Sequence, residues 1–258
     1  MSISISVVMA VYNGRRFLPA QIASVLAQLE PEDELLVIDD ASSDDSIAWL
    51  VSLNDPRLEL HSNSSNLGVL GSFERGLSLA RQSIVFLCDQ DDVWLPGKRA
   101  AFVAAFAADP RTLLVVSDAE LIDANGVVTA PSFMATRGGF RSSAWSTLVR
   151  NRYLGCAMAL RREVLDVALP IPRSVPMHDM WLGAIGSLLG RVHYISTPML
   201  QYRRHGSNVS PEYSQGWSRM LRWRLALLVA LVTRLFTFMI GRHHPMTSSS
   251  GKLGGRKV

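Results

Sequence analysis

The sequence lacks the glycine-rich loops that most often hold phosphates in α/β proteins. No G-x-G-x-x-G follows its first apolar run, and no G-x-x-x-x-G-K-[ST] occurs among its 258 residues. Cysteine is scarce as well, since Cys88 and Cys156 are the only two, and both lie in apolar stretches. We therefore expect two buried thiols in a reducing compartment rather than a disulfide.

The N-terminus lacks the features of a signal peptide. The stretch MSISISVVMAVYNG has no basic residue before its apolar run and no cleavage-site pattern, which favours a cytoplasmic protein. Hydrophobic residues make up 48% of the chain, so general disorder is excluded. The length fits one α/β domain, with or without an appendage.

Acidic residues are missing from the C-terminal end. From Tyr213 to Val258 the chain has eight Arg or Lys residues and no acid, whereas residues 1–212 carry 18 basic and 22 acidic groups. This asymmetry indicates an anionic surface near the tail, either a membrane or a nucleic acid.

The first half alternates between extended and helical patterns. Apolar runs predict strands over residues 4–12, 33–40, 57–63, 83–89 and 112–123, and helical spacing predicts helices over residues 17–29, 70–82 and 96–108. Residues 42–46 offer N-caps for a further helix that runs through about residue 53. Alternating strands and helices describe βαβ units, and near-continuous apolar strands suit a sheet that is covered on both faces. We predict an α/β fold with a doubly wound, mostly parallel sheet.

Polar side chains follow three of these strands, at Tyr12-Asn13, Asp39-Asp40 and Asp89-Gln90-Asp91-Asp92. Ligands of doubly wound sheets bind beyond the carboxyl ends of the strands, and like charges at one edge are costly without a cation. A metal that bridges a phosphate is the explanation we favour. The alternatives are a solvated turn after residue 88 and helix caps at Asp39, Asp40 and Asp92.

Several motifs resemble the family 2 glycosyltransferases of the GT-A fold, and among them the rhamnosyltransferase-like members. They are SVVMAVYNG, LLVIDDASSDDS, NLGVLGSFERGL, FLCDQDDVWLPGK, SDAELIDANG, LGCAMAL, MHDMWLG and YRRHGSN, which span about residues 3–210. The resemblance implies a GT-A domain over residues 1–212. Its nucleotide-sugar-binding half would cover about residues 1–125, and its acceptor-binding half residues 126–212.

On the donor side, the resemblance implies a nucleotide-sugar-binding set. Asp39 would hydrogen-bond a pyrimidine, Asp89 would face the ribose, and Asp91 would hold Mg²⁺ or Mn²⁺ against the diphosphate, a task that suits hard oxygen ligands. Trp94 would shape the site or belong to the core. The other members of the set are Ala10, Tyr12, Asn13 and Gln90.

On the acceptor side, Asp179 stands at the start of an apolar helical pattern, where Asp is a good N-cap. The resemblance makes it the general base instead, with His178 and Trp181 as auxiliary residues, although Met180 stands where relatives often have a second tryptophan. His205 would be a further metal ligand. Arg203 and Arg204 would compensate phosphate charge or line a solvated loop.

These roles describe an inverting transfer from a nucleotide diphosphate sugar to a hydroxyl of a glycan or lipid-linked acceptor. The motifs CDQDDVW and HD-x-W favour dTDP-L-rhamnose as the donor, and a UDP-sugar is the alternative. A non-catalytic glycan- or membrane-binding protein would need no base. A phosphatase that uses clustered acids is disfavoured, because Tyr12-Asn13 occupies the place of its nucleophilic acid.

Residues 213–241 predict an amphipathic helix. Its longest uncharged run, Leu225 to Thr233, is short for a membrane span, whereas apolar residues recur at three- and four-residue steps among arginines, as in helices that lie in a membrane surface. The apolar residues are Leu221, Leu225, Leu228, Val232, Leu235 and Met239. A helix packed on the body or on a second copy in a homodimer is the alternative, and the charge pattern does not resemble a nucleic-acid-binding motif.

Two other segments carry no strong pattern. Residues 129–145 are rich in Gly, Ser and Arg, so we expect a loop on the acceptor side or a plain connector. We expect residues 242–258 to be disordered.

Overall fold

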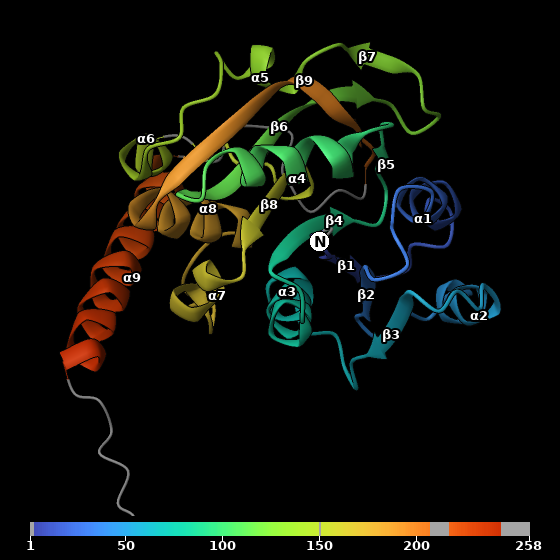
Figure 1. Cartoon of the computed structure of the whole chain (residues 1–258), viewed down its shortest axis with the longest axis horizontal. Coiled ribbons are helices and arrows are strands. Elements are labelled where there is room, and N and C mark those ends of the chain that lie inside the picture. Colours follow the sequence, from blue (N-terminus) through green and yellow to red (C-terminus); the bar gives the residue numbers. More distant parts are fainter. Residues whose placement is uncertain (1–2, 150, 207–216, 244–258) are drawn as a thin grey trace, which may run out of the picture.

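The first half of the chain alternates strands and helices as its sequence predicts. The elements are β1 (Ile5–Val11), α1 (Leu18–Leu26), β2 (Glu34–Asp39), α2 (Ser46–Ser52), β3 (Leu58–Ser62), α3 (Gly68–Leu79), β4 (Ile84–Asp89), β5 (Val93–Trp94), α4 (Lys98–Ala108) and β6 (Thr112–Ile122). Figure 1 shows them in a computed structural model, which describes residues 3–149, 151–206 and 217–243. All the strands and helices predicted for this half are present.

The second half contains shorter elements and one long helix. They are β7 (Val128–Ala130), α5 (Phe133–Thr136), α6 (Ala144–Val149), a 3₁₀ turn (Gly155–Ala157), β8 (Met158–Arg161), α7 (Glu163–Ala168), α8 (His178–Leu189), β9 (Arg191–Arg203) and α9 (Trp217–His243). The stretch expected to be a loop, residues 129–145, therefore holds α5 and the start of α6. Ser132 caps α5, because its side chain accepts a hydrogen bond from the backbone of Ala135.

One sheet of nine strands joins both halves of the described chain, in the order β3-β2-β1-β4-β8-β6-β9-β5, with β7 paired to β6. Strands β3, β2, β1 and β4 are parallel, and β6 and β9 are also parallel to each other. The predicted parallel arrangement is confirmed for the first half, whereas the sheet as a whole is mixed, because β8, β5 and β7 pair antiparallel with their neighbours. The sequence did not predict β8, a strand of four residues that runs antiparallel between β4 and β6.

Helices α3 and α8 cover one face of the sheet. A Cβ on Gly76 of α3 would lie 2.4 Å from a methyl group of Val8, and one on Gly186 of α8 would lie 2.4 Å from a methyl group of Leu114. Both glycines therefore allow the helix backbone to approach the strands closely.

Helices α1 and α4 cover the other face. Phe102 of α4 packs against Phe86 of β4, with ring centroids 5.1 Å apart. Gln21 of α1 donates to the sulfur of Cys88 at 3.0 Å. Cys88 and Cys156 are both buried free thiols, as expected.

Helix α2 begins at Ser46, at the end of the stretch 42–46 that was expected to hold its N-cap, and the segment before it is held as a loop. The side-chain oxygen of Asn13, whose φ is 49°, accepts hydrogen bonds from the backbone N–H groups of Ser43 and Asp44. The serines at 42 and 43 consequently link two loops and do not cap the helix.

Helix α9 packs on α6, α7 and α8 and reaches past the body of the protein (Figure 1). Leu227 and Leu231 are buried against the body, so packing on the body, one of the two alternatives, is confirmed for this face. The stretch Met220–Ile240 is also long and apolar enough to cross a membrane, by length and composition alone, contrary to the expectation from its uncharged run. The expected disorder of residues 242–258 concerns residues that, from 244 on, lie outside the described part of the chain.

Candidate active site

The ends of β2, β1 and β4 bring the predicted donor-side residues to one edge of the sheet. Ala10 is paired with Asp89 across β1 and β4, and Val11 is paired with Asp39 across β1 and β2. Strands that are parallel and in register end together, so the polar residues that follow them must share this edge. The convergence predicted from the sequence is confirmed.

Asp39 is fully buried at the floor of this edge. The backbone N–H of Ser42 lies 3.3 Å from both of its carboxylate oxygens. Ala41, between the two, has a φ of 63°, a conformation that costs free energy for a residue with a Cβ and is often found at ligand sites.

Tyr12 stands at the rim of the site, and its ring is half-exposed. Its backbone N–H donates to the side-chain oxygen of Gln90 at 2.9 Å, and the Gln90 amide donates to the Tyr12 carbonyl at 3.1 Å. A Cβ on Gly14 would lie 2.3 Å from the same Gln90 oxygen. Gln90 and Asn13 therefore shape the loops that hold Tyr12, and both are engaged by backbone groups.

Asp40 has a structural role. One carboxylate oxygen accepts from Asn63 at 2.8 Å and from the backbone of Leu67 at 2.7 Å, and the other accepts from the backbone of Gly68 at 2.9 Å. These N–H groups begin α3, so Asp40 stabilises the N-terminus of α3. Asp40 thus caps a helix, as expected, but the helix is α3 and not α2, the helix that follows Asp40 in the sequence.

Asp92 is fully buried and does not cap α4, contrary to expectation. Helix α4 begins at Lys98, after Gly97 at φ 85°, and Asp92 accepts a hydrogen bond from the backbone of Arg203 at 2.9 Å. Arg203 also donates from its side chain to the Asp91 carbonyl at 2.7 Å. This pair of bonds joins the loop after β4 to the end of β9.

Lys98 is a functional candidate that the sequence reasoning missed. It is fully buried, donates to the Cys156 carbonyl at 2.6 Å, and lies 4.5 Å from the centre of the Trp94 ring. Its positive charge interacts with the negative charges of Asp89 and Asp92 and so offsets part of the charge of the acidic cluster. A lysine in the first turn of a helix opposes the helix dipole, and this mismatch is the signal that could have revealed it.

Trp94 belongs to the core. It is 2% exposed and packs on Phe86, with ring centroids 5.4 Å apart. Of the two roles expected for it, core packing is the one that the structure confirms.

His205 meets the acidic cluster at the end of β9. Its Nε2 lies 2.7 Å from a carboxylate oxygen of Asp91, and its ring stacks on Phe17 with centroids 4.8 Å apart. The two predicted metal ligands, 114 residues apart in sequence, are thus brought together. Asn208, in the same motif, lies outside the described residues.

Of the two arginines beside His205, Arg203 is buried in the loop contacts described above, which leaves it no place in a solvated loop. Arg204 is half-buried, and its side chain donates to the Tyr202 hydroxyl at 3.2 Å.

The donor set at this edge fits a hard divalent cation. Asp91 and His205 offer an oxygen and a nitrogen at the same point, and both side chains keep about a tenth of their surface accessible. A second cluster, Asp89, Asp92 and Cys156, has ligand atoms within 4.8 Å of one another. Its thiol and its depth suit Mg²⁺ and Mn²⁺ poorly, because these ions prefer oxygen ligands and keep water or phosphate in their coordination shell.

The pKa of Asp89 reflects repulsion between carboxylates at this edge. Burial, then repulsion by Asp91 and Asp179, raises the pKa of Asp89 to about 7. Burial and the charges of Asp91 and Asp89 likewise raise the pKa of Asp92 well above its ordinary value. The charge of Asp179, from the second half of the chain, thus acts on Asp89 in the first half.

Asp179 lies in the first turn of α8, one residue past the helix start, and is buried. Burial is the main cause that raises its pKa to about 6. Asn151 donates to one carboxylate oxygen at 3.3 Å, and the backbone of Met180 donates to the other at 2.5 Å. Met177 occupies the N-cap position, so Asp179 is not the N-cap, although its carboxylate accepts from the N–H of Met180 in the first turn. No sequence motif pointed to Asn151.

The two neighbours of Asp179 differ. His178 is buried, stacks on Phe73 with centroids 4.0 Å apart, and finds no hydrogen-bond partner for either ring nitrogen within the described chain. Burial lowers its pKa to about 3. Trp181 is fully buried and donates to the Ala168 carbonyl at 2.8 Å, which makes it a core residue and corrects its expected place on the acceptor side.

A comparison with protein families agrees with this geometry. The model of glycosyl transferase family 2 matches residues 6–168, which include the ends of β1, β2 and β4. The chain belongs to glycosyltransferase family 2. Rhamnosyltransferase specificity, the finer part of the expectation, does not follow from this match.

Two curated relatives illustrate the family. An uncharacterised glycosyltransferase of Nostoc is 30% identical over 217 residues, which cover 79% of this chain and 66% of that protein. The Escherichia coli protein WfgD, named a UDP-Glc:α-D-GlcNAc-diphosphoundecaprenol β-1,3-glucosyltransferase, is 27% identical over 186 residues, which cover 70% of this chain and 69% of WfgD. The chain thus spans about two thirds of the length of these relatives.

Solved structures show the same fold. TarS of S. aureus in complex with UDP-GlcNAc superposes with a TM-score of 0.66 at 19% identity, over 92% of this chain and 73% of that one. The mannosyltransferase PcManGT of Pyrobaculum calidifontis, in complex with GDP-Man and Mn²⁺, has a TM-score of 0.61 at 19% identity, over 93% and 65%. The chain therefore has the GT-A fold, as predicted.

Proposed function

We propose that the chain is an inverting, metal-dependent glycosyltransferase that moves a sugar from a nucleotide diphosphate to a hydroxyl group of its acceptor. The observation that carries this proposal is the presence of one carboxylate suited to bind a cation and a second carboxylate suited to accept a proton. Asp91 with His205 offers a cation site at the donor edge. Asp179, whose charge acts on Asp89 at that edge, has a pKa of about 6. A general base works best when its pKa is near the operating pH.

In the proposed reaction, Asp179 takes the proton of the acceptor hydroxyl while the hydroxyl oxygen attacks the anomeric carbon. The bond from that carbon to the diphosphate breaks, and the nucleoside diphosphate leaves from the opposite face. Asn151 and the backbone of Met180 hold the Asp179 carboxylate in place. A cation bound by Asp91 and His205 would supply positive charge at the leaving diphosphate. No covalent nucleophile is required.

The nucleotide would lie across the ends of β1 and β2. Asp39 at the buried floor would accept a hydrogen bond from the base, and the half-exposed ring of Tyr12 would pack against it. Ala10 offers no polar side chain at this edge.

We propose a pyrimidine nucleotide as the donor. The motifs CDQDDVW and HD-x-W favour dTDP-L-rhamnose, whereas the names of two E. coli relatives begin with UDP-Glc and favour a UDP-sugar. Relatives named for succinoglycan and colanic acid biosynthesis support a role in polysaccharide assembly.

We propose that the protein acts on a lipid-linked acceptor at the cytoplasmic face of the membrane, with α9 at the membrane surface. Of the six apolar residues predicted to face the membrane, only Leu235 is not exposed. Arg234, in the middle of the apolar window, donates to the carbonyls of Val167, Leu169 and Pro170 at 2.6 to 2.8 Å. These bonds hold α9 on the body, which favours a helix that lies on the membrane over one that crosses it.

A thermal-shift panel tests this function. Wild type and Asp91→Ala are heated with dTDP, UDP, GDP or CMP, each with and without Mn²⁺. Ligands that bind only the folded state raise its apparent stability, by about 2.7 kcal/mol at a hundredfold excess over Kd. We expect a Mn²⁺-dependent shift with dTDP or UDP that is lost in Asp91→Ala. The absence of a shift with every nucleotide would contradict the proposal.

A further inference from the structure

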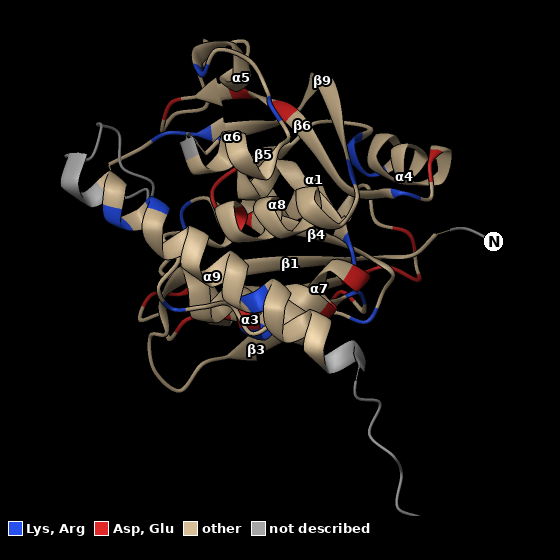
Figure 2. Ribbon diagram, turned by 90° about the vertical axis from the view of Figure 1, so that its left-hand side faces the viewer, with Lys and Arg blue, Asp and Glu red and all other residues tan. Residues whose placement is uncertain are grey.

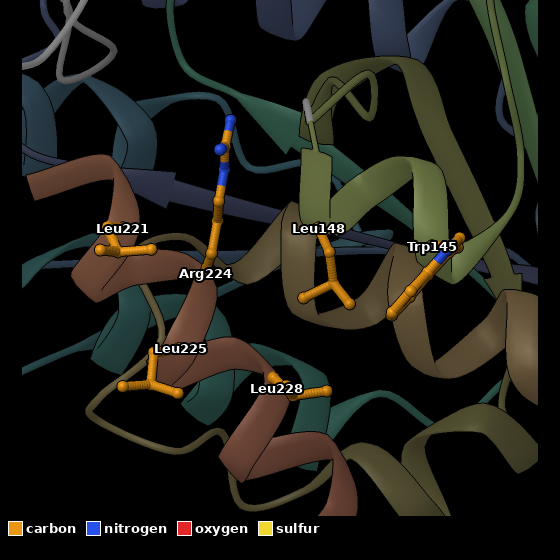
Figure 3. Close-up of a pocket in the computed structure, with 6 residues that line it drawn as sticks. All are labelled: Trp145, Leu148, Leu221, Arg224, Leu225 and Leu228. Carbon is orange, nitrogen blue, oxygen red and sulfur yellow. The ribbon is translucent and has the colours of Figure 1, made fainter. Parts of the chain in front are cut away.

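A groove runs between α6 and the first half of α9. Its volume is about 310 Å³, at the lower end of the roughly 300 to 1,000 Å³ that is common for ligand pockets. Figure 3 shows Leu228 of α9 beside Leu148 of α6, with Leu221 and Leu225 farther along α9, while the Arg224 side chain extends away from the leucines. The lining residues are Trp145, Leu148, Leu221, Arg224, Leu225 and Leu228.

The walls of this groove are apolar and accessible. Trp145 is 74% exposed and Leu221 is 67% exposed. Exposure of such large side chains costs solvation free energy that an apolar ligand would recover, at roughly 25 cal/mol per Å² covered. The groove is thus suited to a hydrocarbon chain.

Helix α9 is apolar on two opposite faces. Leu227 and Leu231 point into the body, whereas Leu225, Val229 and Val232 form part of an exposed stripe. The groove occupies the N-terminal end of that stripe and is continuous with it. One apolar face of α9 is buried against the body, and the opposite apolar face is available to bind a second apolar surface.

The charge around the groove complements an anionic group. Arg222 is exposed and Arg224 lines the groove, and α9 contains no acidic residue. Figure 2 shows basic residues near the start of α9 and no acidic ones along it. A ligand with an apolar chain and a phosphate or diphosphate head matches this combination.

The groove is close to the proposed base. Helix α6, one of its walls, packs on α8, which carries Asp179 in its first turn. Asn151, three residues after the wall residue Leu148, donates to Asp179. A head group at this end of the groove would lie toward the acceptor side of the site.

From these observations we infer that the α6–α9 groove binds the isoprenoid chain of a lipid-diphosphate-linked acceptor and positions its glycan toward Asp179. This inference rests on the proposed function, and it assigns the acceptor's lipid a site of its own. The name of the relative WfgD, which contains diphosphoundecaprenol, agrees with an acceptor of this chemistry.

Photolabelling of the full chain tests the inference. The probe is farnesyl diphosphate that carries a benzophenone group, and labelled peptides are mapped by mass spectrometry. We expect labels within residues 144–148 and 221–228, competed by unlabelled farnesyl diphosphate, and a tenfold loss of labelling in Leu225→Asn and in Trp145→Ser. Val232→Asn is the matched control, because Val232 and Leu225 are both 60% exposed on α9 but only Leu225 lines the groove.

Three results would overturn the inference. The first is labelling that Leu225→Asn and Val232→Asn reduce equally, which would indicate unspecific apolar contact. The second is binding to phosphatidylglycerol vesicles, measured by co-sedimentation without the probe, that Leu225→Asn weakens more than Val232→Asn does, which would make the groove itself the bilayer contact. The third is a homodimer, seen by light scattering, in which the groove stays unlabelled.

The nucleotide panel separates this inference from the proposed function. A Mn²⁺-dependent nucleotide shift without groove labelling would overturn the inference alone. Groove labelling without any nucleotide shift would overturn the proposed function and leave a lipid site.

Discussion

Asp40 and Asp89 lie at the same edge of the sheet but have opposite surroundings, hydrogen-bond donors for Asp40 and other carboxylates for Asp89. Asp40, after β2, accepts three hydrogen bonds, two of them from the backbone at the start of α3. Asp89, at the end of β4, has two carboxylates as neighbours, and burial with their repulsion raises its pKa to about 7. Within the described residues, the Asp89 carboxylate accepts a hydrogen bond from the Cys156 thiol.

Under the proposed function, this difference separates acids that build the fold from acids that a ligand would engage. A carboxylate that backbone N–H groups saturate stabilises the folded state at neutral pH. A carboxylate held against like charges costs stability until a cation arrives. Asp91, Asp92 and Asp179 share the environment of Asp89, and they are the residues that the proposed function uses or surrounds.

The largest effect is expected for Asp179→Asn. The amide keeps the shape but cannot take a proton, so kcat should fall by about 10² to 10⁴, while nucleotide binding stays intact. The measurement is sugar transfer with the donor that the nucleotide panel identifies. Asp166→Asn is the control, because Asp166 is an exposed acid of α7, and unchanged turnover in Asp179→Asn would remove Asp179 from the mechanism.

The next effect concerns the fold. Asp40→Asn should lower the free energy of unfolding by about 1 to 3 kcal/mol, because either orientation of the amide turns an NH₂ group toward a hydrogen-bond donor. Urea denaturation measures the loss. Asp45→Asn, at an exposed position with no side-chain cap bond, should be nearly neutral, and an equal loss in both variants would refute the structural role of Asp40.

The third effect is a pH dependence of stability without metal. Since the folded-state pKa of Asp89 lies above its ordinary value, the folded state binds this proton more tightly. The resulting stabilisation is fully present below about pH 4 and is lost as the pH rises through about 7, with a slope of at most about 1.4 kcal/mol per pH unit. The difference between wild type and Asp89→Asn across this range isolates the contribution. The same slope in both proteins would contradict it.

The sequence predicted the sheet well, because β-branched runs and intervening helical spacing are local signals. It also predicted that residues 12, 39 and 89 meet, since parallel strands end at a common edge. The contact of Asp91 with His205 followed from a resemblance to a family and not from spacing, as the two residues are 114 positions apart.

The errors arise where long-range contacts override local patterns. The position of Asp92 suggests a helix cap, but its carboxylate accepts a hydrogen bond from the backbone of Arg203 in β9. Trp181 looks like part of a binding motif, but it packs under Arg234 of α9. The short strand β8 and the roles of Lys98 and Asn151 depend on tertiary neighbours that no local pattern specifies.

The free energies of unfolding of Asp89→Asn and Asp40→Asn, at pH 8 and without divalent metal, test the central claim most directly. The account predicts opposite signs. Asp89→Asn should be more stable than wild type by about 1 kcal/mol or more, since one pKa unit corresponds to about 1.4 kcal/mol, and Asp40→Asn should be less stable. Destabilisation of both variants to a similar extent would contradict the division between acids of the fold and acids of the site.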